Sequence, residues 1–550
     1  MKKPLMRLML LLGLLLGVTG AFALDAKSAP GSDDPILRDL QEEMARSKAQ
    51  LRLDNMAAPY FIDYRVVDID DWEADAALGG LRSETHSQIR FLLVQVRLGD
   101  YKLDSSSAHG EGAIEVVPLD NDEHAFRFQV WSATDKAYKQ AVEALTDKQA
   151  RLKQLTIDHP VDDFARADAV QSVEPLVRLK LEHDPWLKML RDASGIYTQD
   201  PNVQFVDATL SFKAVNRYYL NSEGTLVRSG EQLYRMAISG NTQADDGMRL
   251  DRSTVFTANS VGDLPKAAEF QEGAHTLMTS LKQLREAPLA DEDYHGPVLL
   301  SAHSAVPVFA SLIGENLLGN KPELGQNARV RGQFASSYKT RVLPDFLSVV
   351  DDPSMDALQG TALLGHYEVD DEGVRAQRVP LVEKGVLVSY LLGRQPIRDF
   401  PSSNGHGRAG LPLNWPAPAW GNLIVSSSEA VSAAELKRKL LAICKERGLD
   451  YGYYVETMGT ARAPIVLYRV WVKDGREELV RGALFGDLDQ RSMRSNIVAA
   501  GDDQHAENDV RTVPLSVVAP SILFDDLEVK RQTSNKDKLP EYPAPETAKK

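Results

Sequence analysis

Residues 203–242 read VQFVDATLSFKAVNRYYLNSEGTLVRSGEQLYRMAISGNT. This composition is typical of successive antiparallel strands. At residues 221–224 the chain reads NSEG, which supplies the turn chemistry of a hairpin, because Asn and Gly tolerate the backbone angles of tight turns. We therefore expect antiparallel sheet to dominate this part of the chain.

The segments before this stretch add further strands and single helices. Three runs rich in β-branched and aromatic residues predict strands, at 59–70, 89–104 and 125–131. Asp34 followed by Pro35 predicts a helix start, because Asp caps a first turn and Pro is favoured at its first position. Residues 135–155 predict a long helix with a polar face.

The second half of the chain also combines strands with single helices. Its sequence predicts a strand at 296–302, a helix at 432–447 and strand-like runs at 453–459, 465–475, 476–487 and 513–531. Strands dominate and helices are scattered singly, so the predicted class is α+β, with two domains built mainly from antiparallel sheets. We place the domains at 33–290 and 291–531, and expect disorder in the polar, proline-containing tail at 532–550.

The N-terminus predicts export. Three basic residues lie within MKKPLMR, an apolar run follows at 8–18, and small residues end it in an Ala21-x-Ala23 pattern. The run is shorter than the roughly 20 residues of a membrane helix, and its flanks fit a cleaved signal peptide at 1–23. A retained membrane anchor is the alternative. We expect a periplasmic or secreted protein with no membrane span after cleavage.

Charge and cysteine content exclude some classes of function. Loss of three positive charges with the signal changes the formal charge from −15 to −18. This balance argues against nucleic-acid binding, which needs clustered Lys and Arg. Cys444 is the one cysteine of the chain, so no internal disulfide can form, and its apolar surroundings predict a buried side chain.

No common catalytic motif is present. The chain lacks G-x-S-x-G, a phosphate-binding P-loop and C-x-x-C, and none of its eleven histidines begins a His-Glu-x-x-His sequence. The most distinctive segment is 369–410, where an acidic turn at 369–373 and a hairpin precede the glycine-rich SSNGHGRAG at 402–410. We interpret the latter as a flexible loop that could line a cavity; a plain surface hairpin is the alternative.

Several motifs in one order resemble a known family. They are GPVLL at 296–300, LPDFLSVVDDP at 343–353, DDEGVRAQRVPLVEKGVL at 370–387, the glycine-rich loop, VRGALFGD at 480–487 and VPLSVVAPSILFDDLEV at 513–529. Together they resemble the TldD/PmbA family of metallopeptidase-related proteins, once described as modulators of DNA gyrase. The resemblance implies a two-domain subunit whose dimer encloses a cavity. It also implies proteolysis of unfolded peptides by a zinc-bearing subunit, which can pair with a paralogue that lacks zinc.

The resemblance also shows what this chain lacks. Zinc-bearing members carry His-Glu-x-x-Gly-His on a helix and a cysteine near the C-terminus; here Ala310 and Ser311 stand at the His-Glu positions and Glu315 at the second His. Region 499–515, where the cysteine is expected, contains none. A catalytic zinc needs about three protein ligands. We therefore expect no catalytic residue, no bound zinc and no other cofactor. A different metal site made of Glu315, His303 and His505 is an alternative that the spacing does not favour.

The sequence thus leads to a non-catalytic subunit of a peptidase complex that acts on unfolded peptides. We expect a dimer, in one version with a zinc-bearing paralogue. Two alternatives remain open at this point. One is an active metallopeptidase with unconventional ligands, and the other is a homodimeric peptide-binding protein.

Overall fold

The computed structural model describes residues 33–52, 56–106, 112–411, 414–533, 535–542 and 545. The predicted signal peptide at 1–23 lies outside these residues. Among the helices that are described, none is both long and apolar enough to cross a membrane. Helices and mostly antiparallel sheets make up the fold, which confirms the α+β class. Every sheet takes its strands from one side of residue 290 alone.

One long, curved sheet forms the N-terminal half. Its order is β3-β2-β1-β5-β6-β4, with β7 also paired to β6. The predicted hairpin at 221–224 is confirmed: Asn221 Oδ1 accepts hydrogen bonds from the backbone of Glu223 and Thr225, and Gly224 has φ +106°. The strands are β1 Phe61–Ala77, β2 Gly80–Arg97, β3 Ala113–Val116, β4 Gln171–Val173, β5 Val203–Asn221, β6 Leu226–Gln243 and β7 Arg249–Ala258.

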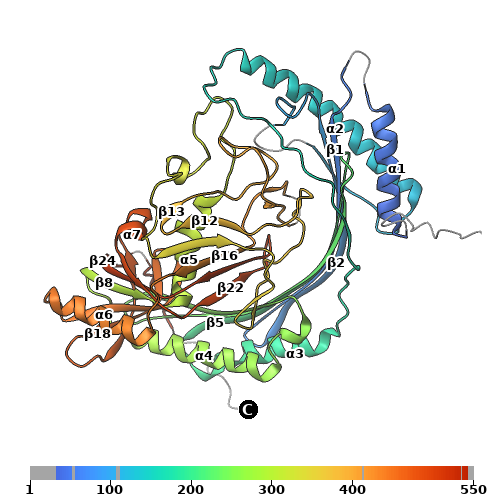
Figure 1. Cartoon of the computed structure of the whole chain (residues 1–550). Coiled ribbons are helices and arrows are strands. Elements are labelled where there is room, and N and C mark those ends of the chain that lie inside the picture. Colours follow the sequence, from blue (N-terminus) through green and yellow to red (C-terminus); the bar gives the residue numbers. More distant parts are fainter. Residues whose placement is uncertain are drawn as a thin grey trace, which may run out of the picture.

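Four helices cover the outer face of this sheet (Figure 1). α1 and α2 pack on one end around Leu40, Tyr64 and Val130, and α3 and α4 pack on the other end around Leu190, Phe212 and Phe270. The helices are α1 Pro35–Gln50, α2 Glu123–Leu152, α3 His183–Ser194 and α4 Ala267–Glu286. Short 3₁₀ turns lie at Gly195–Gln199 and Val261–Asp263.

The strand predicted at 125–131 is wrong, because α2 already begins at Glu123. The Asp122 carboxylate caps its first turn by accepting from the backbone N–H of Ala125. Phe126 and Val130 lie four residues apart and face the core, whereas Phe128 is exposed. The large side chains that alternate in the sequence, as in a strand, therefore lie on two different faces of a helix.

The C-terminal half contains two larger sheets. Their orders are β13-β12-β9-β16-β23-β22 and β19-β18-β17-β8-β24-β20, with β21 paired to β24. The strands are β8 Asp293–Leu300, β9 Leu347–Asp351, β10 Ala357–Leu358, β11 Thr361–Ala362, β12 Val379–Glu383, β13 Val386–Leu387, β14 Gly407–Arg408, β15 Ala417–Pro418, β16 Asn422–Ser427, β17 Tyr451–Thr460, β18 Ala463–Trp471, β19 Glu477–Val480, β20 Ala483–Phe485, β21 Ile497–Ala500, β22 His505–Asp509, β23 Leu515–Ala519 and β24 Ile522–Arg531.

The helices of this half are α5 Ala302–Leu312, α6 Ala433–Glu446 and α7 Gln490–Ser495, with 3₁₀ turns at Gly314–Leu317 and Gln333–Ser336. α5 lies in the largest core of the molecule, where Val308 and Phe309 are fully buried. α6 covers the other face of the β8 sheet, and its Cys444 is buried as predicted.

The curved N-terminal sheet wraps around the C-terminal half (Figure 1). Ile69, Phe91 and Val215 on the inner face of the sheet pack against Leu364 and Val510 from the C-terminal half. Apolar contact therefore joins the two halves, and it brings β22 close to the inner face of the sheet.

Part of the C-terminal tail is ordered, contrary to the prediction of disorder. Lys536 forms a β-bridge with Met248, and the backbone of Arg249 exchanges hydrogen bonds with Asn535. Gln243 donates to the carbonyl oxygen of Asp537. The polar composition of the tail predicts a solvated segment, but the backbone of residues 535–537 forms hydrogen bonds with the chain around the β6–β7 turn.

Candidate functional site

Helix α5 holds the residues that stand at the zinc-motif positions. Ser301 caps the helix by accepting from the N–H of Ser304 at 3.0 Å. Ala310 packs against the core and Ser311 is exposed, while Glu315 lies just beyond the helix in the 3₁₀ turn. Gly314 is needed for close packing, because a Cβ atom there would lie 3.0 Å from Leu423 Cδ2.

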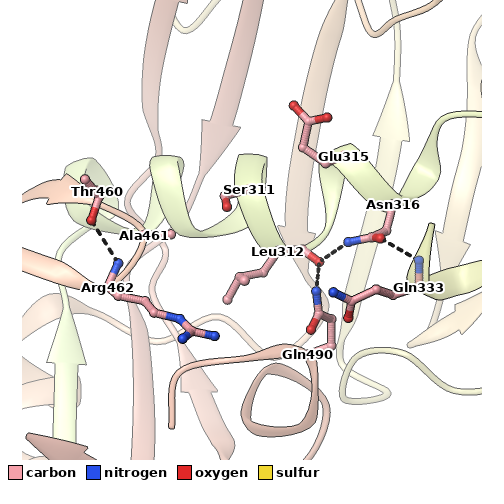
Figure 2. Close-up of a pocket in the computed structure, with 9 residues that line it drawn as sticks. All are labelled: Ser311, Leu312, Glu315, Asn316, Gln333, Thr460, Ala461, Arg462 and Gln490. Atoms are coloured by element: carbon pink, nitrogen blue, oxygen red, sulfur yellow. Dashed lines mark hydrogen bonds between the residues drawn. The ribbon is translucent and has the colours of Figure 1, made fainter. Parts of the chain in front are cut away.

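A pocket of about 540 Å³ opens at the C-terminal end of α5 (Figure 2). Asn316 is fixed inside it, because its amide donates to Leu312 O at 3.1 Å and its Oδ1 accepts from Gln333 N at 3.0 Å. Gln490 Nε2 also donates to Leu312 O, at 3.5 Å. The pocket is lined by Ser311, Leu312, Glu315, Asn316, Gln333, Thr460, Ala461, Arg462 and Gln490.

The polar groups of the pocket fall into two sets. In Figure 2 the side chains of Arg462, Gln333 and Gln490 lie on one side of α5, whereas Glu315 points to the other side. In the described part of the chain, neither the Arg462 guanidinium nor the Gln333 side-chain amide has an intramolecular hydrogen bond or ion pair. These two groups are therefore available to a ligand.

The motif positions do not fit zinc. The Ala310 side chain has no donor atom and contacts the core, and Ser311 offers a neutral hydroxyl. Glu315 supplies a single carboxyl group, whose pKa is raised by partial burial. None of the nine lining residues is a histidine or a cysteine. A catalytic zinc needs about three protein ligands from His, Cys, Asp or Glu, and Glu315 is the one such residue among the nine that line the pocket.

The alternative metal site is only half assembled. The rings of His303 and His505 lie 4.9 Å apart, centroid to centroid. Glu315 is twelve positions further along, roughly 18 Å from His303 along the helix axis at 1.5 Å per helical residue. The structure thus brings the two histidines together at the start of α5 and leaves Glu315 at the other end.

A second group of possible ligands lies on the surface. Asp293, His295 and Glu528 have ligand atoms within 4.8 Å of one another. Asp293 and His295 are exposed, and Glu528 already forms an ion pair with Lys530 at 2.8 Å. Competition from this lysine and full access to solvent weaken the group as a metal site.

The glycine-rich loop at 402–410 is packed, and the prediction of a flexible loop is wrong. His406 is fully buried, with Nε2 3.0 Å from Asp351 Oδ1. The Gly407 N–H donates to Asp370 Oδ2 at 2.9 Å, and a Cβ at Gly407 would collide with Glu372. The glycines therefore permit close approach to the acidic turn at 369–373. Both segments line a small cavity of about 50 Å³ against Arg65 and Tyr219 of the N-terminal sheet.

The acidic turn holds two buried carboxyl groups. Burial and the neighbouring Glu372 raise the pKa of Asp370 to about 8, and burial also raises the pKa of Glu372. Arg65 and Arg394 lower the pKa of Glu372 but do not outweigh its burial. The pair therefore retains a proton at a pH where exposed carboxyl groups are ionised.

This pair predicts a pH-dependent stability. Between an ordinary carboxyl pKa near 4 and about 8, the folded protein keeps a proton that the unfolded chain loses, so the free energy of unfolding falls as pH rises. The slope from one proton is at most about 1.4 kcal/mol per pH unit. Glu372→Gln, which removes the neighbouring charge, is expected to flatten this slope. Urea unfolding at pH 5, 6, 7 and 8 measures the slope of the unfolding free energy with pH. Equal slopes in Glu372→Gln and the unaltered protein would contradict the assignment of the retained proton to this pair.

Comparison with known proteins finds a family match for the C-terminal half of the chain. Residues 294–531 match the family described as "PmbA/TldA metallopeptidase C-terminal domain". A metalloprotease of Methanothermobacter thermautotrophicus is 28% identical over 209 residues, which cover 35% of this chain and 40% of that protein. The matched part thus spans less than half of that relative.

Solved structures share the fold over most of the chain. A proposed modulator of a DNA gyrase from Thermotoga maritima has a TM-score of 0.58 at 16% identity, covering 89% of this chain and 99% of its own. TldE from Thermococcus kodakarensis has a TM-score of 0.56 at 11% identity, and a proposed gyrase modulator from Bacteroides thetaiotaomicron has a TM-score of 0.57 at 13% identity. Each of these two matches covers 90% of this chain and 99% of the other chain. Identities this low establish the fold alone. The C-terminal half, residues 294–531, therefore belongs to the TldD/PmbA metallopeptidase-related family, as the order of its motifs predicted, and most of the chain shares the fold of these solved structures.

Proposed function

We propose that this protein is a non-catalytic subunit of a peptidase complex and that it binds unfolded peptides in the pocket at the end of α5. One observation carries the proposal. The family's helix and its Gly314 are present, but the pocket beside them is lined by amide and guanidinium groups in place of metal ligands. We therefore assign this pocket to peptide binding and not to hydrolysis.

The lining suits a peptide. A cavity of about 540 Å³ falls in the size range of small-ligand sites. Gln333 can both donate to and accept from a peptide backbone, and the Arg462 guanidinium can bind a carboxylate through two N–H groups. Both side chains are free of intramolecular partners within the described residues. Asn316 is already satisfied and serves to shape the wall.

The proposal includes a partner and a location. A subunit that binds but does not cleave needs a zinc-bearing paralogue for proteolysis, and a dimer would bring the two sites together. The predicted signal peptide places this complex in the periplasm or outside the cell. Co-purification from native cells, followed by identification of the bound proteins, tests both points. A zinc-bearing paralogue in the complex supports the proposal, and a homodimer without such a partner favours the homodimeric peptide-binding protein.

Hydrolysis is tested directly with unfolded casein. We expect the purified chain to leave casein intact with and without added Zn²⁺, because a hydrolytic zinc needs about three protein ligands and Glu315 is the one candidate among the residues that line the pocket. Glu315→Ala is expected to behave like the unaltered protein. Cleavage that requires Zn²⁺ and disappears in Glu315→Ala would overturn the proposal in favour of a metallopeptidase with unconventional ligands.

A further inference from the structure

Two histidines from distant parts of the chain meet at the start of α5. His303 is the second residue of this helix and His505 is the first residue of β22. Their rings lie 4.9 Å apart at an interplanar angle of 86°. β22 is the last strand of its sheet, so the pair lies at the edge of the C-terminal half. This place is separate from the pocket at the other end of α5.

The hydrogen bonds leave nitrogen atoms free on both rings. His303 Nδ1 lies 3.3 Å from the carbonyl oxygen of Glu456, which can only accept, so Nδ1 carries a proton and the neutral form of the ring has a free Nε2 lone pair. Metal-binding histidines commonly have such a backbone partner on their second nitrogen. Within the residues that the structure describes, neither ring nitrogen of His505 has a hydrogen-bond partner. Burial and the proximity of His303 lower the pKa of His505, which favours its neutral form.

A carboxylate on the same strand is a third possible ligand. Side chains alternate along a strand, so Glu507 is on the same face of β22 as His505. Ala506 between them packs against Leu363 and Val518 on the opposite face, which fixes the direction of both neighbours. Glu507 has an exposed surface, yet the protein atoms crowded around it raise the pKa of its carboxyl. His303 acts on that pKa in the opposite direction, since its positive form attracts the carboxylate.

We propose that His303, His505 and Glu507 form a binding site for one divalent transition-metal ion of the zinc type. Two imidazoles and one carboxylate are ligands that suit Zn²⁺ and its neighbours in the first transition row, whereas Mg²⁺ and Ca²⁺ prefer oxygen ligands throughout. The three ligand atoms do not all lie within 4.8 Å of one another in the described conformation. Binding therefore requires the exposed Glu507 side chain to rotate towards the two rings.

Such an ion would connect α5 to β22. Its remaining coordination positions would face solvent and could hold water, as three protein ligands leave a tetrahedral site incomplete. The site does not use Glu315 or any residue of the pocket. Metal binding here is therefore compatible with a subunit that does not cleave peptides.

The test uses the chain after removal of residues 1–23, freed of metal with a chelator. Zn²⁺ titration by calorimetry is expected to give one site per chain, and Co²⁺ is expected to give the visible absorption of a four-coordinate ion. His303→Ala and His505→Ala should weaken Zn²⁺ binding by more than about 100-fold, because loss of second-shell partners alone costs 10–100-fold. Glu507→Gln should weaken it less.

The surface group supplies a matched control. His295→Ala removes one histidine from the Asp293, His295 and Glu528 group and should leave Zn²⁺ binding unchanged. Circular dichroism of the metal-free variants checks their folding; His303 is exposed, so His303→Ala decides the question even where His505→Ala does not fold. The proposal is overturned if the unaltered chain binds no stoichiometric Zn²⁺. It is equally overturned if binding survives His303→Ala or is lost in His295→Ala.

Discussion

Replacing Arg394 with methionine is expected to lower the free energy of unfolding by about 3–5 kcal/mol, the effect of removing one partner from a buried ion pair. Arg394 is 1% exposed, and its Nε and Nη2 both donate to the carbonyl oxygen of Ala165, at 3.0 and 2.7 Å. Nη2 also lies 2.7 Å from Glu223 Oε2. Since Ala165 and Glu223 belong to the N-terminal half, this one side chain joins the two halves of the molecule.

The cost arises mainly from the groups left behind. Methionine fills a similar volume and keeps the contact with Phe61 and Phe164, over whose rings the guanidinium lies at 5.0 and 4.1 Å. The Glu223 carboxylate, however, loses its cation and, among the residues that the structure describes, keeps a side-chain hydrogen bond from the Tyr101 hydroxyl alone, at 2.7 Å. Adding Glu223→Gln to Arg394→Met should therefore recover part of the loss, because a neutral amide costs less to bury than an unpaired charge.

Urea unfolding followed by tryptophan fluorescence measures these differences. Arg438→Met is the control, since Arg438 is exposed on α6 and pairs with Glu435 on the helix surface, where such pairs contribute at most about 1 kcal/mol. A loss below 1 kcal/mol in Arg394→Met would show that the interface tolerates removal of this cation.

The sequence predicts those parts of the fold, such as tight turns, in which residues close in the chain contact one another. The NSEG turn between β5 and β6 was predictable because Asn221 forms its turn through residues two and four positions away. The segment at 125–131 was not, since Phe126, Phe128 and Val130 fit a strand pattern as well as a helix. Packing of this segment on β2 favours the helix over the strand, and the periodicity of the sequence alone does not reveal that contact.

The candidate site depends on contacts between distant residues. Gln490 reaches Leu312 across 178 positions and Arg394 reaches Ala165 across 229, so no local motif marks them. The sequence gives no signal for Arg462 and Gln333 for the same reason, while the family motif singles out Ser311 and Glu315 without predicting the pocket that they line. The glycine-rich sequence predicts a flexible loop because nothing in it indicates the contact with the acidic turn, which forms only when the two segments fold together.

Replacing Arg462 with alanine is expected to weaken the binding of unfolded peptides by about 10- to 100-fold. Hydrogen bonds to charged groups contribute roughly 1.5–3 kcal/mol, and each 1.4 kcal/mol is a factor of ten in affinity. Arg462 is exposed at the pocket mouth, in the turn between β17 and β18, and has no intramolecular ion pair among the described residues. Alanine therefore removes a ligand contact without breaking an internal one.

Arg491→Ala is the matched control, because it removes the same charge from an exposed neighbour of Gln490 that does not line the pocket. Fluorescence anisotropy with a labelled casein peptide measures both variants at two salt concentrations. If Arg462 binds a peptide carboxylate, amidating the peptide C-terminus and neutralising its acidic side chains should reproduce the loss. The same neutral peptide should then bind Arg462→Ala and the unaltered protein equally. Equal weakening in Arg462→Ala and Arg491→Ala would instead show that affinity follows net charge, because a specific contact cannot be shared by a residue outside the pocket.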